Sequence, residues 1–483
     1  MVSTLLFAAA LCVPQGESPF RIVDVPQPKE IVLEVGGILP RGDTLFVCTR
    51  RGEVWRIDDA YGASPRYVRW AEGLQEPLGL LDDVDGKAIL VSQRGELSRM
   101  SDDDGDGRMD RLATLASGWP LSGNYHEYCF GPTRTPDGAL WLTLNKPFGD
   151  EPFGVADWRG FAIRCTPDGG FEAVCAGLRS PAGVATAPWG EVFYTDNQGE
   201  WCPTSKLAML EPGSFHGHPH GIESCKLPQS KVAHPGEIES GLREEDFAKR
   251  HPSYRLPAVW IPYDLLGRSP SGFVWDESGR FGPYRGSIFA GDQYSCEVMR
   301  LTIEKVAGRW QGACYPFVTG LKSGITRVAW GSDGSLICGL TDRGWTATGT
   351  ARDGLQRIVW NREAWDRAPV FDLLEVRATP RGFALQFSVP VDAATAQASA
   401  LRVKRWTYDH HSEYGCKERG TQELAVEGVT LSDDGLRLDL VVPERRAVWV
   451  HELRIDGLRA RDGGAKPWHE VAWYTLNAIP AGD

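Results

Sequence analysis

The chain has 483 residues, with 42% hydrophobic and 24% charged residues, which suits two or three folded domains and argues against a disordered chain. Its formal net charge is −12 and no run of lysine or arginine stands out, so no nucleic-acid partner is expected. The acidity fits neutral or cationic small partners, or simply a well-solvated surface.

Residues 1–16 are predicted to form a signal peptide. A short apolar stretch is followed by small residues, with an Ala8-x-Ala10 cleavage option, although the basic start of many signal peptides is missing. The alternative is a frayed terminus. We therefore expect a secreted or periplasmic protein. No later segment has the ~18 consecutive apolar residues that a membrane helix needs, so no transmembrane segment is expected.

Eleven cysteines are many for a cytosolic protein and fit an oxidising compartment. Position along the chain suggests three disulfides, each across a hairpin or loop: Cys165–Cys175, Cys296–Cys314 and Cys202–Cys225. Cys48, Cys129 and Cys338 lie within apolar runs and are expected to be buried thiols. No CxxC occurs, so neither a zinc ribbon nor a thioredoxin-type site is indicated.

Residues 20–365 contain six imperfect copies of one unit, in which a turn leads to an apolar strand and a second strand follows. The first strands of the copies, with their turns, lie at residues 42–47, 85–91, 137–143, 189–194, 285–290 and 333–338. Abundant glycine and aromatic residues fit strands joined by tight turns. The sequence therefore predicts an all-β fold, a six-bladed β-propeller.

The pattern changes after Trp360. Residues 368–480 contain short alternating strands, for example 383–389, 436–442 and 449–455. About seven short strands in ~110 residues indicate an immunoglobulin-like β-sandwich, a module that is usually structural or adhesive.

Acidic side chains alternate in residues 101–110. Asp102, Asp104, Asp106 and Asp110 follow a D-x-D-x-D-G-x-x-D pattern, which places hard oxygen ligands on a glycine-turned loop. The loop lacks the twelfth-position glutamate of a full EF-hand. We expect a structural calcium ion here; the alternative is a solvated acidic turn.

Residues 124–128 precede the third blade's first strand and are expected to line the central mouth of the propeller. They are Asn124, Tyr125, His126, Glu127 and Tyr128. A neutral imidazole at this place can act as a general base. The alternative is a histidine whose hydrogen bonds are satisfied within its own loop.

Two segments frame the fourth blade's inner strand. Arg179 lies in residues 177–183, at the entry to that blade, and residues 195–201 follow its inner strand. The second segment supplies polar and aromatic side chains that suit a sugar, and would also suit a calcium ion: Asp196, Asn197, Gln198 and Trp201.

Residues 73–80, which include Glu76, together with 124–132, 195–199 and 217–219 resemble planctomycete-type secreted propellers labelled membrane-bound or sorbosone-dehydrogenase-like. The resemblance covers most of residues 20–360. More distantly, the chain is similar to soluble sugar dehydrogenases that use pyrroloquinoline quinone (PQQ) with calcium. That similarity implies that His126 takes the proton of the sugar hydroxyl and that Arg179 contacts the quinone.

Three departures from the quinoprotein pattern concern the cofactor. Ser180 replaces an asparagine, residues 291–293 stand where a lysine is expected, and one arginine, Arg327, remains where the pattern has two. PQQ carries carboxylates that need charge compensation when buried, so these losses weaken the prediction of quinone binding.

Three functions remain open at this point. The first is a carbohydrate-active oxidoreductase, acting on a sugar or aldehyde, with His126 as base; the lack of a haem-attachment CxxCH implies a separate electron carrier. The second is a cofactor-independent lyase or hydrolase, in which a tyrosine (Tyr125 or Tyr128) and Arg179 assist His126, or in which Glu127 and Asp196 form a carboxylate pair. The third is a non-catalytic glycan-binding propeller.

Overall fold

The computed structural model describes residues 18–149 and 156–482, and most of its regular structure is β-strand. No helix in these ranges is long and apolar enough to cross a membrane. The expected signal peptide lies outside the described residues, so its prediction stays untested.

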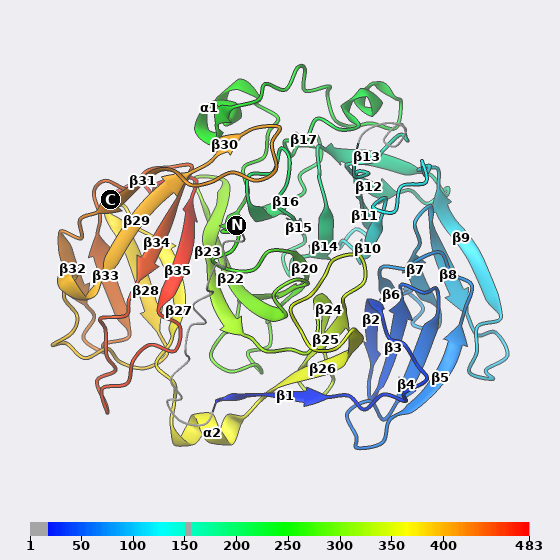
Figure 1. Cartoon of the computed structure of the whole chain (residues 1–483), viewed down its shortest axis with the longest axis horizontal. Helices are drawn as coiled ribbons and strands as arrows, with labels where there is room; N and C mark the ends of the chain where they lie inside the picture. Colours follow the sequence, from blue (N-terminus) through cyan, green and yellow to red (C-terminus); the bar gives the residue numbers. More distant parts are fainter. Residues whose placement is uncertain (1–17, 150–155, 483) are drawn as a thin grey trace, which may run out of the picture.

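Six sheets, antiparallel apart from one short edge strand in the third, follow one another around a centre, as the blades of a propeller do (Figure 1). Blades 1 to 3 are β2 (Val35–Arg41), β3 (Thr44–Thr49), β4 (Val54–Asp58), β5 (Arg66–Ala71); β6 (Leu80–Asp82), β7 (Ile89–Ser92), β8 (Glu96–Ser101), β9 (Arg111–Ser117); and β10 (Cys129–Arg134), β11 (Leu140–Leu144), β12 (Phe161–Cys165), β13 (Phe171–Ala176), with the short β17 (Ser214–Phe215) at the edge. Blades 4 to 6 are β14 (Pro181–Thr186), β15 (Val192–Asp196), β16 (Ser205–Met209), β19 (Val259–Ile261); β20 (Pro270–Trp275), β21 (Ile288–Asp292), β22 (Glu297–Val306), β23 (Arg309–Val318); and β24 (Ile325–Trp330), β25 (Leu336–Thr341), β26 (Asp353–Trp360), β1 (Phe20–Asp24).

The ring is closed in two ways. The first strand of each blade contacts the first strand of the next, and β24 of the sixth blade contacts β2 of the first. In addition, β1 pairs with β26, from Phe20 opposite Trp360 to Asp24 opposite Gln356, so the start of the described chain is the outermost strand of the last blade. This pairing covers an edge that would otherwise be open to other chains.

The predicted repeat corresponds to the middle of each blade. Each of the six sequence copies falls on the second and third strands of one sheet, from β3 and β4 to β25 and β26. In the turns before β11 and β25, Gly138 and Gly334 have φ of 86° and 80°, a region that other residues avoid. All six residues of β25 are buried. Both faces of this strand pack into core clusters, with Leu336, Cys338 and Leu340 in one and Ile337 in another.

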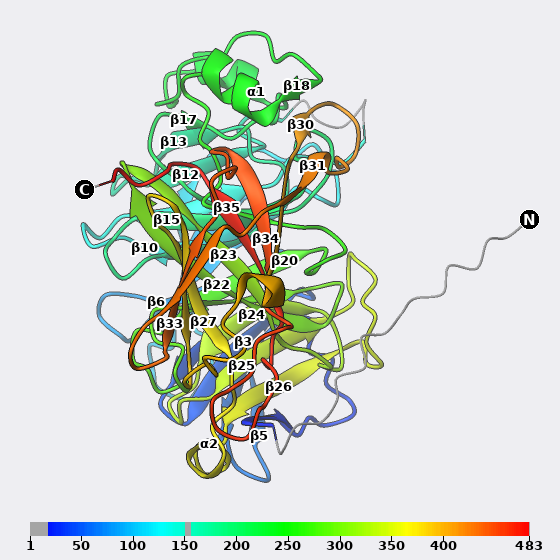
Figure 2. The ribbon, with the colours of Figure 1, turned by 90° about the vertical axis from the view of Figure 1, so that its left-hand side faces the viewer.

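The C-terminal part is a sandwich of two sheets, but it is not separate from the propeller. One sheet is β27 (Leu373–Ala378), β28 (Gly382–Phe387), β33 (Arg437–Val441) and β32 (Gly428–Leu431). The other sheet continues blade 5 through β35 (Val471–Leu476), β34 (Trp449–Arg454), β29 (Arg402–Thr407) and β31 (Arg419–Leu424). The join is the pairing of β23 with β35, in which Ala313 lies opposite Tyr474 (Figures 1 and 2). Blade 5 and the sandwich therefore share one hydrogen-bonded sheet.

Short elements tie the sandwich to blades 3 and 4. The strand β18 (Leu242–Arg243), at the start of α1 (Glu244–Arg250), pairs with β30 (Asp409–His410) from the sandwich. His410 is buried there, 3.2 Å from a Glu244 carboxylate oxygen and 3.0 Å from the Gly217 carbonyl oxygen. Helix α2 (Arg362–Arg367) joins the propeller to the sandwich, and two 3₁₀ turns, Ile222–Lys226 and Ala398–Ala400, complete the elements.

The three predicted disulfides are wrong, because every cysteine in the described ranges is a free thiol. Strand register explains the first: Cys165 lies opposite Phe171, while Cys175 lies opposite Ala162. Likewise Cys314 lies opposite Leu301, several residues along β22 from Cys296. Cys202 is buried beside the mouth, whereas Cys225 lies in the 3₁₀ turn of residues 222–226.

Candidate functional site

A narrow pocket opens at the centre of the ring, where the first strands of the blades begin. Strands β10 and β14 start immediately after Tyr128 and Ser180, which brings both residues to the axis. The cavity has a volume of about 70 Å³. Its wall also includes Arg268 from the loop before β20 and Tyr414 from a loop of the sandwich. We call it the mouth pocket.

His126 lies in the wall of the mouth pocket with both ring nitrogens engaged. Its Nδ1 is 2.6 Å from the Lys146 carbonyl oxygen, which only accepts, so Nδ1 carries the proton. Nε2 is then the acceptor, 3.0 Å from Ser180 Oγ. The ring stacks on Phe148 with centroids 3.5 Å apart. Burial lowers the pKa of His126 to about 3, and the charges of Arg179 and Lys146 act in the same direction.

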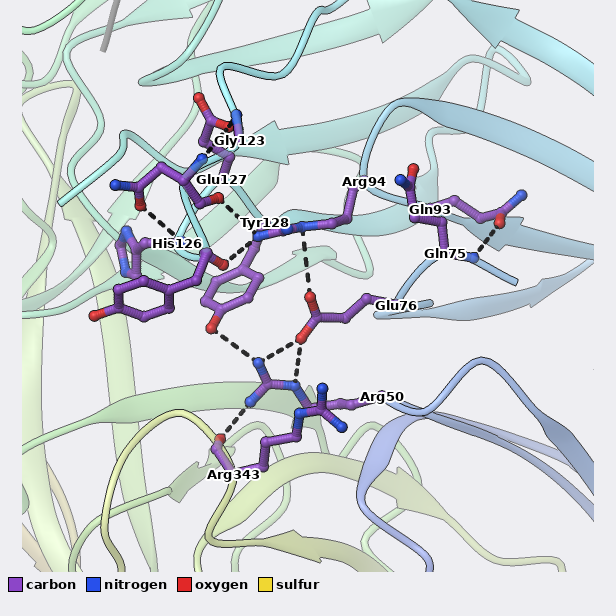
Figure 3. Close-up of polar contacts among 12 residues, drawn as sticks. Arg50, Gln75, Glu76, Gln93, Arg94, Gly123, His126, Glu127, Tyr128 and Arg343 are labelled. Carbon is purple, nitrogen blue, oxygen red and sulfur yellow. Dashed lines mark hydrogen bonds and ion pairs between the residues drawn. The ribbon is translucent and has the colours of Figure 1, made fainter. Parts of the chain in front are cut away.

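The loop that carries His126 is fixed by buried polar side chains. Asn124 accepts from the His126 backbone N–H at 2.9 Å and donates to the Phe148 carbonyl at 2.8 Å, so it positions both stacked rings. Glu127 is fully buried and accepts from the backbone N–H groups of residues 122–124 (Figure 3). Glu127 therefore shapes the loop and does not line the mouth pocket.

Arg159, which sequence reasoning missed, holds the same loop from behind. It is fully buried and donates to the carbonyl oxygens of Arg94, Pro120, Glu127 and Tyr128, at 3.0–3.2 Å. Burial lowers its pKa to about 10. One guanidinium thus donates to four carbonyl groups around this loop, of which that of Tyr128 also accepts from the Asn145 backbone N–H at 3.0 Å.

Asp196 has a comparable supporting role for the turn before β14. It is fully buried, and its carboxylate accepts from the backbone N–H groups of Arg179 at 3.1 Å and Ser180 at 2.7 Å. Asn197 donates to the Ser180 carbonyl at 3.0 Å. These bonds place the Ser180 hydroxyl against His126.

Arg179 lines the mouth pocket, and its charge is already compensated. Its guanidinium donates to Glu200 at 2.9 Å and 3.2 Å, and its carbon lies about 5 Å from the ring centroids of Phe148 and Tyr414. Glu200 also pairs with Lys146, and His218 Nε2 is 3.8 Å away. Although burial opposes it, the His218 contact and the Arg179 and Lys146 charges hold the pKa of Glu200 well below its usual range. Sequence analysis did not single out Glu200; its only signal was its position within residues 195–201.

A second ionic group lies on the opposite wall (Figure 3). Glu76 accepts from Arg50 at 2.6 Å and 3.0 Å, and Arg94 Nε lies 3.4 Å from its other oxygen. Arg50 also donates to the Tyr128 hydroxyl at 2.9 Å and contacts the Arg343 carbonyl. Tyr128 and Arg50 line the mouth pocket, whereas Glu76 stands behind them as the bridge between two arginines.

The other predicted residues divide between the pocket and its surroundings. Asn197 and Gln198 line the mouth pocket. Tyr125 is 57% exposed and does not. Trp201 lies at the contact with the sandwich, where its backbone N–H donates to the His411 carbonyl at 2.9 Å.

Arg327 lies deeper, beside the first strands of the blades. Its guanidinium donates to the carbonyl oxygens of Leu78 and Ala182, both at 2.8 Å, and lies over the Phe130 ring. Burial lowers its pKa to about 10. Arg327 therefore links blades 2, 4 and 6 near the axis and does not line the pocket.

The predicted calcium loop connects β8 and β9. Carboxylate oxygens of Asp102, Asp104 and Asp106 lie within 4.8 Å of one another, so these three residues can hold a metal ion. All four aspartates also accept from backbone N–H groups of the loop, and Asp110, which is not part of this cluster, accepts from those of Asp103 at 2.7 Å and Asp104 at 3.2 Å. The structure thus groups three of the four predicted ligands and gives the fourth a part in shaping the loop.

Comparisons with known proteins show similarity in fold to solved structures. A family model described as a domain of unknown function, DUF7133, matches residues 54–236, and no curated protein matches the chain in sequence. A putative oxidoreductase (glucose dehydrogenase) from Thermus thermophilus aligns with a TM-score of 0.51 and 19% identity, over 70% of this chain and 100% of that one.

Two further solved structures align less well. The PQQ-bound aldose sugar dehydrogenase of Streptomyces coelicolor has a TM-score of 0.49 and 17% identity, over 71% of this chain and all of its own. The calcium structure of a Trichoderma reesei carbohydrate-active enzyme of family AA12 has a TM-score of 0.49 and 11% identity, over 73% and 98% of the two chains. About 70% of this chain therefore has a β-propeller fold similar to that of the Thermus thermophilus protein.

Proposed function

We propose that the mouth pocket is the active site of a secreted carbohydrate-active enzyme in which His126 is the general base. The observation that carries this proposal is the Nε2 atom of His126, an acceptor in the pocket wall whose tautomer is set by the Lys146 carbonyl. A neutral imidazole with a pKa of about 3 keeps its lone pair at every physiological pH.

The pocket wall suits a small hydroxylated molecule. Asn145, Asn197, Gln198 and Gln293 offer amide donors and acceptors, and Tyr414 offers an aromatic face. Ser180 Oγ now occupies the hydrogen-bonding position at Nε2. A sugar hydroxyl that replaces it would lie within reach of the base, at ordinary hydrogen-bond distance.

The reaction that we propose first is oxidation of a sugar or aldehyde, as the name of the Thermus thermophilus structure suggests for that protein. In such a reaction His126 would accept the hydroxyl proton while the hydride of the same carbon passes to a separate two-electron carrier, since no acceptor is built into the chain. Asn124 and Phe148 hold the imidazole in place, and Arg179 stabilises the developing negative charge of the oxygen.

PQQ, the cofactor of the Streptomyces coelicolor structure, does not fit the residues of this mouth. The cavity of about 70 Å³ is far below the ~300–1,000 Å³ of ordinary ligand pockets. The three arginines in its wall are already paired: Arg50 with Glu76, Arg179 with Glu200, and Arg268 with Asp264. A tricarboxylate would find no uncompensated cation among them.

This mismatch favours a second function, a cofactor-independent lyase on a uronic glycan. His126 would remove the proton beside the carboxylate, and Tyr128 would protonate the leaving oxygen. Arg179 would donate a hydrogen bond to that carboxylate while it stays paired with Glu200. Hydrolysis by Glu127 and Asp196 is less favoured, since both carboxylates are committed to backbone N–H groups.

One experiment separates these functions. Purified protein is mixed with aldoses, aldehydes and a redox dye, with and without PQQ and Ca²⁺, and dye bleaching is followed. In parallel, uronic polysaccharides are screened for the ultraviolet absorption of an unsaturated product. Dye bleaching that is lost in His126→Ala supports oxidation. An ultraviolet-absorbing product that is lost in the same variant supports the lyase. Sugar binding without turnover in either assay would contradict both and favour a glycan-binding propeller.

We also propose that residues 102–106 bind a structural Ca²⁺. Three carboxylates lie within 4.8 Å of one another on a glycine-turned loop, and hard oxygen ligands of this kind are those that Ca²⁺ prefers. The loop joins two adjacent strands of blade 2, so an ion there would stabilise the outer edge of that blade. Metal analysis of the purified protein tests this directly.

A further inference from the structure

A second cleft, with a volume of about 730 Å³, lies away from the mouth pocket. It is formed by the β10–β11 turn, the β14–β15 turn and the β22–β23 hairpin, and we call it the back cleft. The residues that matter below are Asp137, Trp141, Trp189, Glu191, Lys305 and Trp310.

The back cleft and the mouth pocket lie at opposite ends of the same strands. His126 and Ser180 precede β10 and β14, whereas Asp137 and Trp189 follow the ends of these strands. Each strand has six residues, which at ~3.3 Å per residue separates the two sites by roughly 20 Å. A ligand in the back cleft therefore does not touch the mouth.

The back cleft contains a rigid aromatic surface. Trp189 is 49% exposed, although it is among the largest side chains. Its ring stacks on Trp310 with centroids 5.3 Å apart and an angle of 23°. The edges of Phe193 and Trp275 pack against Trp189 at 6.4 Å and 6.1 Å. Three aromatic neighbours thus hold an exposed indole in one orientation, which lowers the entropic cost of binding through it.

Polar groups border this aromatic surface. Glu191 pairs with Lys305 at 3.0 Å, and Asp137 accepts from Arg164 at 2.6 Å. Trp141 is only 6% exposed and lines the cleft, and its Nε1–H has no hydrogen-bond partner among the described residues. A buried donor of this kind costs free energy until an acceptor reaches it.

We propose that the back cleft binds a neutral oligosaccharide. The C–H face of a pyranose stacks on an exposed indole, and its hydroxyls can donate to Asp137 and Glu191 and accept from Trp141. An acidic glycan is disfavoured, because Lys305 is the one cation that lines the cleft in the described chain and Glu191 already compensates it. The proposal does not depend on the function assigned to the mouth pocket.

Affinity electrophoresis tests it. The intact protein runs through native gels that contain hydroxyethylcellulose, glucomannan, arabinoxylan or polygalacturonate. Retardation by at least one of the three neutral polymers is expected, and Trp189→Ala should weaken the apparent affinity about fivefold or more, as loss of one stacked ring does. Trp189→Phe, which keeps a smaller ring, should restore part of it and shows that the cleft is still folded.

Trp345→Ala is the matched control, since this tryptophan is 41% exposed but lies at the mouth pocket. It should leave retardation by the neutral polymers unchanged. Retardation by none of these polymers, retardation by polygalacturonate alone, or a loss confined to Trp345→Ala would overturn the proposal.

Discussion

The mouth pocket and the back cleft are built at the two ends of the same strands, yet their chemistry differs. At the mouth, each arginine of the wall is paired with a carboxylate, and little free volume remains. At the back, an exposed tryptophan and two carboxylates border an open cleft. Dense, fixed charge suits reaction at one small group, whereas an open aromatic surface suits retention of a longer chain.

The largest effect should come from His126→Ala. In the assay that detects turnover, we expect the rate to fall by about 10²–10⁴-fold, the usual contribution of a general base. Retardation in the neutral-polymer gels should not change, because the back cleft is distant. His234→Ala, a histidine paired with Glu223 outside the mouth, serves as control. Equal loss in both variants would contradict the assignment.

Glu200→Gln should destabilise the mouth strongly. The substitution keeps the shape but removes the charge that compensates Arg179 and Lys146, both buried, so we expect a loss of about 3 kcal/mol in the free energy of unfolding by urea. Glu223→Gln, whose partner Lys226 is exposed, should cost far less, because solvent screens an ion pair at the surface. Similar losses of unfolding free energy in the two variants would mean that the ion pairs of Glu200 stabilise the protein no more than an exposed pair does.

Lowering the pH should destabilise the protein through its buried neutral histidines. Burial lowers the pKa of His126 and of His218 to about 3, against 6.5 for an unfolded histidine. Between these values the unfolded chain binds more protons, so stability is lost as the pH falls from 6.5 towards 3. For each such histidine the loss at pH 5 is about 2 kcal/mol. Urea unfolding of His126→Gln should show a shallower pH dependence; an unchanged slope would contradict the assignment.

The smallest effect should be that of calcium, which acts on blade 2 outside both sites. Excess Ca²⁺ over a chelator should raise the melting temperature by about 3 °C. The double variant Asp104→Asn, Asp106→Asn should lose this response without changing turnover or gel retardation. A calcium response that survives in the variant would place the ion elsewhere.

Local patterns were enough to predict the strands and the position of His126. Each copy of the repeat joins a turn to an apolar strand, and both signals act over a few residues. His126 and Arg179 were predicted at the mouth because they come just before first strands, and both line the mouth pocket. Because the blades follow one another in chain order, the position of a residue in the sequence was enough to predict its blade.

Contacts between distant segments could not be predicted in this way. The partner of Arg179 is Glu200, and Tyr414 reaches the mouth from the sandwich, more than 200 residues away along the chain. Strand register, which places Cys165 opposite Phe171 and Cys175 opposite Ala162, is set by the turn between β12 and β13. Nothing in the residues around Ala313 indicates that β23 pairs with β35.

The role proposed for His126 requires a neutral ring with its acceptor nitrogen in the mouth pocket, and ¹⁵N NMR of histidine-labelled protein measures both properties. His126→Asn identifies the signals. We predict a neutral imidazole protonated at Nδ1 down to pH 5, with the Nε2 signal shifting when the substrate found by screening is added. Titration of that ring near pH 6.5, or protonation at Nε2, would rule out this role for His126.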